Sequence, residues 1–129
     1  MPIAAVLKVL VVDDQTSVRQ MTRMSLEQIG VRHIHEAENG RLAMDTASLQ
    51  PLDLIISDYN MPEMDGLALL RAVRGHPAAR KVPFILLTGR GDRELVVKAA
   101  QAGANNYLIK PFTPEILKQK IEQVMGKLS

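Results

Sequence analysis

Polar side chains end four apolar runs of this sequence, and their types suit phosphate or metal chemistry. They are Asp13 and Asp14 after residues 8–12, Ser57 and Asp58 after 54–56, Thr88 after 84–87, and Lys110 after 106–109. Apolar runs of this length are typical of strands in a parallel sheet that helices cover on both faces, and the carboxyl ends of such strands line a ligand-binding crevice. We therefore expect these side chains to meet at one edge of a sheet.

Asp13, Asp14 and Asp58 would bring three negative charges to that crevice. At about 4 Å each pair of carboxylates repels by roughly 1–4 kcal/mol, depending on local screening. Lys110 can neutralise one charge, and a hard divalent cation suits the others because Mg²⁺ prefers oxygen ligands. The sequence therefore predicts a Mg²⁺ site.

A carboxylate, a metal, a lysine and a hydroxyl are together the groups that phosphoryl transfer needs. Asp58 is the natural nucleophile, with Asp13 and Asp14 holding the metal. Thr88 would donate a hydrogen bond to one phosphoryl oxygen, and Lys110 would pair with another. The predicted chemistry is transfer of a phosphoryl group to Asp58.

Five strands alternating with five helices are needed to position these residues. We predict strands over 8–12, 31–37, 54–58, 84–87 and 106–109, with helices from Thr16 or Ser17 to Gly30, over 39–47, 66–73 and 93–102, and from Thr113. This alternation predicts βαβ units and an α/β fold with a parallel sheet. The polar strand ends cluster only in the flavodoxin-like, doubly wound (βα)5 arrangement with strand order 2-1-3-4-5.

Hydrophobic periodicity predicts the buried faces of three helices. The residues expected to point inward are Val18, Met21, Leu26 and Ile29 in the first helix, Leu95, Val96 and Ala99 in the fourth, and Ile116, Leu117, Ile121 and Val124 in the last. His33 and His35 share one face of the second strand, and we treat them as structural.

Composition bounds the class of protein. The chain has 129 residues, 47% of them hydrophobic, no Cys, and a formal net charge of +2. This fits a single domain spanning 1–129, with no apolar run of the roughly 20 residues that a membrane span needs. We expect a cytoplasmic protein that binds no membrane. Two Tyr, two Phe and no Trp are too few for base-stacking platforms, so direct nucleic-acid binding is disfavoured as well.

The motifs resemble those of one family across nearly the whole chain. They are Asp13-Asp14, the segment Asp58-Tyr59-Asn60-Met61-Pro62 with Met64-Asp65-Gly66, Thr88, Tyr107, and Lys110-Pro111-Phe112. In this order they resemble the receiver domains of bacterial two-component response regulators, and closely the CheY-like, stand-alone receivers of chemotaxis. The resemblance implies that Asp58 is the phosphoacceptor, in a Mg²⁺-dependent step that the receiver itself catalyses. It also implies that the backbone carbonyl of Asn60 completes the metal site and that the Lys110–Pro111 peptide is cis.

The resemblance further implies a switch and two kinds of partner. After phosphorylation Thr88 would move toward the phosphate, and Tyr107 would turn inward to fill the vacated space. A sensor histidine kinase or histidine phosphotransfer protein would supply the phosphate. A downstream target protein would read the surface formed by residues 93–102, 106–109 and 113–125.

Other interpretations stay open from the sequence. A phosphorelay intermediate, a phosphate sink or the receiver fragment of a longer regulator would carry the same residues, whereas a scaffold that has lost phosphorylation is disfavoured by the intact set. A phosphatase with an aspartyl nucleophile commonly has a second acid two residues later, where this chain has Asn60, whose amide cannot act as a general acid. Arg90 stands where the CheY-like pattern has an acid, and we expect it to prolong the phosphate lifetime.

Overall fold

The computed structural model describes residues 2–89 and 93–129, and its five strands form one parallel sheet. The strands are β1 (Lys8–Val12), β2 (His33–Ala37), β3 (Leu54–Asp58), β4 (Phe84–Thr88) and β5 (Asn106–Ile109). Their order is β2-β1-β3-β4-β5, with all neighbouring pairs parallel. This confirms the predicted flavodoxin-like topology and places the carboxyl ends of β1, β3, β4 and β5 side by side.

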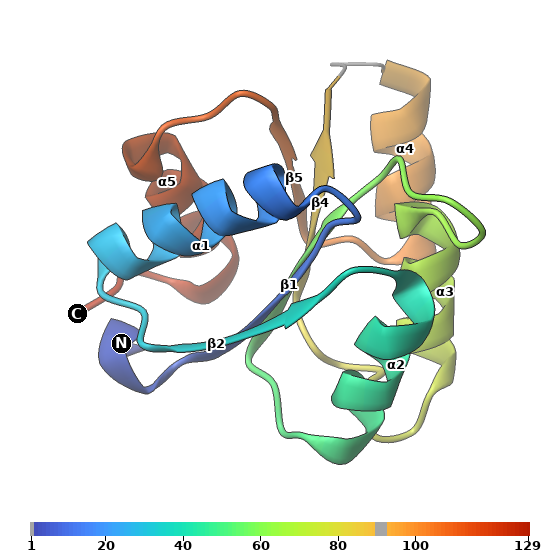
Figure 1. Ribbon diagram of the computed structural model, residues 1–129, viewed down its shortest axis with the longest axis horizontal. Helices are drawn as coiled ribbons and strands as arrows, with labels where there is room; N and C mark the ends of the chain where they lie inside the picture. Colours follow the sequence, from blue (N-terminus) through green and yellow to red (C-terminus); the bar gives the residue numbers. More distant parts are fainter. Residues whose placement is uncertain (1, 90–92) are drawn as a thin grey trace.

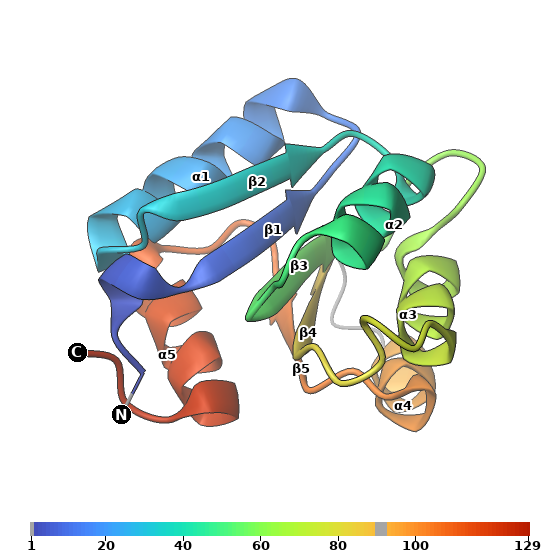
Figure 2. The same ribbon diagram turned by 90° about the horizontal axis from the view of Figure 1, so that it is seen from below.

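Helices cover both faces of the sheet. They are α1 (Thr16–Ile29), α2 (Gly40–Leu49), α3 (Gly66–Gly75), α4 (Arg93–Ala102) and α5 (Pro114–Met125), preceded by the short 3₁₀ helix η1 (Ala4–Val6). In Figures 1 and 2, α1 and α5 lie together on one face, whereas α2, α3 and α4 line the other. None of the helices within the described ranges is long and apolar enough to cross a membrane.

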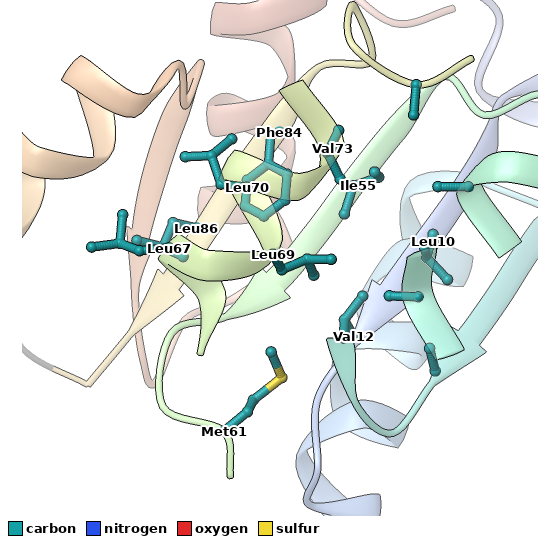
Figure 3. Packing of buried hydrophobic residues seen from close by; sticks show 14 of the residues in the cluster. Leu10, Val12, Ile55, Met61, Leu67, Leu69, Leu70, Val73, Phe84 and Leu86 are labelled. Atoms are coloured by element: carbon teal, nitrogen blue, oxygen red, sulfur yellow. The ribbon is translucent and has the colours of Figure 1, made fainter. Parts of the chain in front are cut away.

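Two hydrophobic cores sandwich the sheet, because successive strand residues point to opposite faces. Leu10, Ile55 and Phe84 pack beneath α3 in the first core, which Figure 3 shows with Leu69 and Leu70 of the helix. Alternate strand residues such as Val11 and Ile56 form the second core, beneath α1 and α5. Every residue of β3 and β4 is buried, which explains why these strands are unbroken apolar runs that end in Asp58 and Thr88.

Local capping sets the helix boundaries close to their predicted positions. Gly30 ends α1 in the left-handed conformation with φ 108°, which glycine adopts without steric cost. The side chain of Thr113 accepts a hydrogen bond from the Ile116 N–H and so caps α5, as expected. As expected, α1 begins at Thr16, although its cap residue is Gln15, which makes no side-chain capping bond.

Several sequence expectations need correction. Met21 and Ile116 were expected to point inward, but they are 60% and 43% exposed, because periodicity cannot tell where the margin of a helix face meets solvent. Thr22 is buried in α1 instead, and its hydroxyl donates to the Val18 carbonyl, which satisfies its polarity. The second strand begins at His33, because the Val31 N–H is bonded to Leu26 at the end of α1.

Gly66, the first residue of α3, is pressed against the chain that follows β3. Its N–H donates to the Tyr59 carbonyl at 2.7 Å. A Cβ atom at this position would lie 2.5 Å from the Asp58 carbonyl oxygen and 2.8 Å from the Tyr59 Cα, closer than such atoms can approach. The close packing of α3 therefore depends on a residue without a side chain here.

We predict that Gly66→Ala destabilises the protein by about 1–3 kcal/mol, because the new methyl group meets backbone that must shift. Gly75→Ala is the matched control, since a Cβ atom at Gly75 meets nothing within 4 Å. There we expect no loss, and a gain of up to about 1 kcal/mol from the better helix former. Urea unfolding of both variants tests this, and equal stabilities would refute the packing argument.

Candidate functional site

The structure brings three carboxylates together at the carboxyl edge of the sheet. Asp13 and Asp14 follow β1, Asp58 is the last residue of β3, and one carboxylate oxygen from each lies within 4.8 Å of the others. Asp13 and Asp58 are only 1% and 4% exposed, whereas Asp14 faces solvent. The adjacency of β1 and β3 therefore creates the predicted acidic cluster.

Lys110 enters this cluster from the end of β5. Its Nζ atom lies 2.8 Å from Asp58 Oδ1 and 3.9 Å from Asp13 Oδ2. Its backbone N–H donates to the Thr88 carbonyl at 2.8 Å, which ties the ends of β4 and β5 together. The Lys110–Pro111 peptide is cis, as the resemblance implies. One cation thus faces two of the three acids.

A cavity of about 170 Å³ opens beside Asp58. It is lined by Gln15, Asp58, Tyr59, Asn60, Thr88, Gly89 and Lys110. The predicted residues Thr88, Asn60 and Lys110 therefore surround the predicted nucleophile. Gln15 was missed by the sequence argument, and its only sequence signal is its place directly after the acidic pair.

A larger cavity of about 560 Å³ lies at the opposite, amino-terminal ends of the strands, between Leu52, Arg80 and Pro83. None of the acids of the predicted site lines it. The small cavity at the carboxyl edge is therefore the one that combines a nucleophile, a hydroxyl and a cation.

The surroundings of Asp13 disfavour a negative charge on its carboxyl group. Burial raises the pKa of its carboxyl group, and the Asp58 carboxylate adds to this rise, while the Gln15 N–H and the Lys110 ammonium oppose it. The Gln15 N–H bonds Asp13 Oδ1 at 2.9 Å. Asp13 Oδ2 is buried without a hydrogen-bond partner in the described part of the chain. A buried carboxylate oxygen in this state is costly unless a positive charge reaches it.

This donor set fits Mg²⁺. The ion takes oxygen ligands, keeps several waters, and binds through one or two carboxylates with phosphate oxygens. Asp13, Asp14 and Asp58 are positioned to hold such an ion, and the unpartnered Asp13 Oδ2 is one atom that it would satisfy.

Tyr107 lies outside this cavity, half-buried on β5 with its ring below Lys120 of α5, whose Nζ atom is 4.6 Å from the ring centroid. Val97 of α4, Ile109 of β5 and Ile116 of α5 expose 42–47% of their surfaces. His33 and His35 lie on the edge strand β2, away from the acidic cluster. Arg90 lies outside the described residues.

Comparison with known proteins gives one family and relatives that carry chemotaxis names. Residues 9–122 match the family described as the response regulator receiver domain. The chain is 50% identical over 128 residues to a protein of Rhizobium etli named "Probable chemotaxis protein CheY", covering 99% of both chains. It is 40% identical to the chemotaxis protein CheY1 of Helicobacter pylori, covering 93% of this chain and 98% of that protein.

A solved structure shows the same fold as this chain. The chemotaxis response regulator CheY4 of Vibrio cholerae superposes with a TM-score of 0.84 at 37% identity, covering 92% of this chain and 98% of that one. Both kinds of comparison therefore point to the same family as the site geometry.

We predict that Asp13→Asn stabilises the metal-free protein by about 1 kcal/mol at pH 7, because it removes a charge that burial and the Asp58 carboxylate disfavour. Since the folded pKa of Asp13 is raised, the native state holds the proton better than the unfolded chain. Stability is therefore lost as pH rises through that pKa, and the gain from Asn grows over the same interval. Thermal unfolding at several pH values without Mg²⁺ measures it; a gain that shrinks with rising pH would contradict the assignment.

Proposed function

The chain belongs to the family of response regulator receiver domains, and from this premise we propose that Asp58 accepts a phosphoryl group from a phosphohistidine in a Mg²⁺-dependent step. The observation that carries the proposal is the 2.8 Å contact between Lys110 Nζ and Asp58 Oδ1, beside the two acids that follow β1. The donor is a sensor histidine kinase or a histidine phosphotransfer protein. The receiver unit spans residues 1–129.

In the transfer, an oxygen of the Asp58 carboxylate forms a bond to phosphorus while the bond from phosphorus to the donor imidazole nitrogen breaks. The electron pair of the broken bond stays on that nitrogen. Lys110 holds the Asp58 carboxylate in place, and the Thr88 hydroxyl donates to a phosphoryl oxygen from the facing strand end. Asp13, Asp14, Asp58 and the Asn60 carbonyl would hold Mg²⁺, which would supply positive charge to neutralise the transferred group.

The protein acts as a phosphorylation-switched signalling module rather than as an enzyme on a separate substrate. An aspartyl phosphatase uses a second acid two residues after its nucleophile, and the residue at that place is Asn60, which lines the cavity. An amide side chain cannot act as a general acid. The chemistry at Asp58 is therefore confined to accepting the phosphoryl group and losing it to water.

Phosphorylation is transmitted through Thr88 and Tyr107. The new charges draw Thr88 toward the phosphate, and Tyr107 on the adjacent strand turns inward into the space. β4 and β5 are bonded in register, with Leu86 opposite Tyr107 and Thr88 opposite Ile109, so this movement has a short path. To take an active state from about 1% to 99%, the phosphate must favour it by about 5.5 kcal/mol, which several charge-assisted hydrogen bonds can supply.

The surface of α4, β5 and α5 is the one that a downstream protein reads. Val97, Ile109 and Ile116 expose apolar area there, one from each element. Tyr107 adjoins the same surface through its contact with Lys120. The chemotaxis proteins among the relatives support a target in the control of motility, and we propose no direct binding of nucleic acid.

We predict that acetyl phosphate with Mg²⁺ adds the mass of one phosphate to the protein, and that Asp58→Asn abolishes the gain because an amide is no nucleophile here. Intact-protein mass spectrometry measures it, with and without Mg²⁺. Asp45→Asn is the matched control, since Asp45 is exposed on α2 and takes no part in the acidic cluster. Labelling of folded Asp58→Asn, or labelling that ignores Mg²⁺, would refute the proposal.

We predict that Thr88→Ala is still labelled but no longer transmits the signal. In the unaltered protein, phosphorylation should shift the amide resonances of Ile109 and Ile116, which lie on the target-binding surface. In Thr88→Ala these shifts should fall to less than about half of those in the unaltered protein, because the hydroxyl that moves toward the phosphate is removed. Thr46→Ala, which removes a hydroxyl that donates to the Leu42 carbonyl within α2, serves as control. Full shifts in labelled Thr88→Ala would exclude the proposed route.

A further inference from the structure

Arg19, a residue that the proposed chemistry does not use, binds the backbone of the acidic pair Asp13 and Asp14. Arg19, in the first turns of α1, donates from Nη1 to the backbone carbonyl of Asp13 at 2.7 Å. Its Nε atom donates to Glu36 Oε1 on β2 at 2.9 Å. The Arg19 side chain is only 14% exposed, and its bond to the Asp13 carbonyl is partly buried, whereas its bond to Glu36 lies closer to solvent. Arg19 thus connects the edge strand to the backbone of the acidic cluster.

The carbonyl that Arg19 binds belongs to the peptide that joins Asp13 to Asp14. A peptide unit is planar, so the orientation of its carbonyl also sets the positions of both flanking Cα atoms. The two carboxylates of the cluster start from those atoms. The Asp13 N–H is anchored to the Ala37 carbonyl at 3.1 Å, and the Asp13 Oδ1 atom accepts from Gln15. Arg19 supplies a further restraint through the Asp13 carbonyl, and it is not among the residues that line the cavity.

Glu36 keeps Arg19 in this orientation. Its two carboxylate oxygens are bound by different arginines, Oε1 by Arg19 and Oε2 by Arg23 at 2.8 Å. Burial opposes ionisation of Glu36, but the bonds from Arg23 and Arg19 outweigh it, and the pKa of this carboxyl lies below its ordinary value. The ion pairs run between α1 and β2, which lie alongside one another in Figure 2.

We propose that Arg19, oriented by Glu36, is a positioning residue for the metal-binding acids Asp13 and Asp14. This inference rests on the proposed function, because it concerns the same Mg²⁺ site. Arg19 touches neither the ion nor the phosphoryl group; it acts by fixing the peptide from which both ligands project. Residues behind metal ligands typically contribute 10–100-fold to metal affinity when they orient those ligands.

The test is the dissociation constant for Mg²⁺ alone, measured from the amide shifts of Gln15 and Tyr59 in the full chain. Arg19→Ala should weaken Mg²⁺ binding about 10-fold, the lower end of that range. Arg19→Lys should weaken Mg²⁺ binding less than Arg19→Ala, because the ammonium group retains the positive charge. Some loss should remain, because an ammonium group cannot reproduce the planar fork that spans Glu36 and Asp13.

Arg23→Ala is the matched control. It also removes an arginine from Glu36, but the contacts of Arg23 are with Glu36, Glu27 and the Ile34 carbonyl rather than with Asp13. We expect both alanine variants to lower the thermal midpoint of the metal-free protein by similar amounts, and Arg23→Ala to leave the Mg²⁺ dissociation constant within about twofold. A purely structural role for Arg19 would change the midpoint and not the affinity.

An unchanged Mg²⁺ affinity in Arg19→Ala, or an equal loss in Arg23→Ala, would overturn this inference and leave the proposed function standing. Absence of Mg²⁺ binding by the unaltered protein would overturn both. If Arg19→Ala does not fold, Arg19→Lys decides the matter: a loss of affinity beyond that of Arg23→Ala supports the inference, and none refutes it.

Discussion

The repulsion among three carboxylates at one edge of the sheet is the constraint on which this structure depends. Asp13 and Asp58 are buried, and the ammonium group of Lys110 is 2.8 Å from Asp58 and 3.9 Å from Asp13. A single lysine cannot balance three negative charges in a partly desolvated site. The surplus charge fits a divalent cation, and under the proposed function that cation would in turn favour a phosphoryl group. An arrangement that is unfavourable in the metal-free protein is thus the basis of its chemistry.

The parallel sheet makes this arrangement possible because it resists the repulsion with a rigid frame. β1 and β3 are hydrogen-bonded in register, their residues are buried except for Lys8 at the start of β1, and the two acids that follow β1 meet Asp58 at the end of β3. Gly66 brings α3 against the turn after Asp58, and the bonds to Arg19 and Gln15 restrain the turn after β1. The hydrophobic cores on either side of the sheet provide the free energy that holds the like charges together.

The same frame connects the site to a distant surface. Lys110 reaches Asp58 from β5 through its side chain and bonds the Thr88 carbonyl through its backbone. Under the proposed function, a movement at Asp58 would pass through these contacts to the strand that carries Tyr107 and the exposed Ile109. Tyr107 in turn lies beneath Lys120 of α5. The proposed switch would therefore use local electrostatics at one edge to select between two arrangements of the α4, β5 and α5 surface.

The sequence by itself determined the order of elements, the sheet topology and the polar residues that end the strands. This was possible because a strand buried on both faces is an unbroken apolar run, and the first polar residue after it marks the end of the strand. Only the tertiary structure decided the rest. The Lys110–Asp58 contact joins residues 52 positions apart. Met21 and Ile116 proved exposed, and Thr22 buried, because the edge of a helix face depends on what packs beside it. Arg19 and Glu36 look like ordinary surface charges in the sequence. Their contacts arise only where α1 meets β2 and the residue after β1, since hydrogen-bond geometry is a property of the assembled fold.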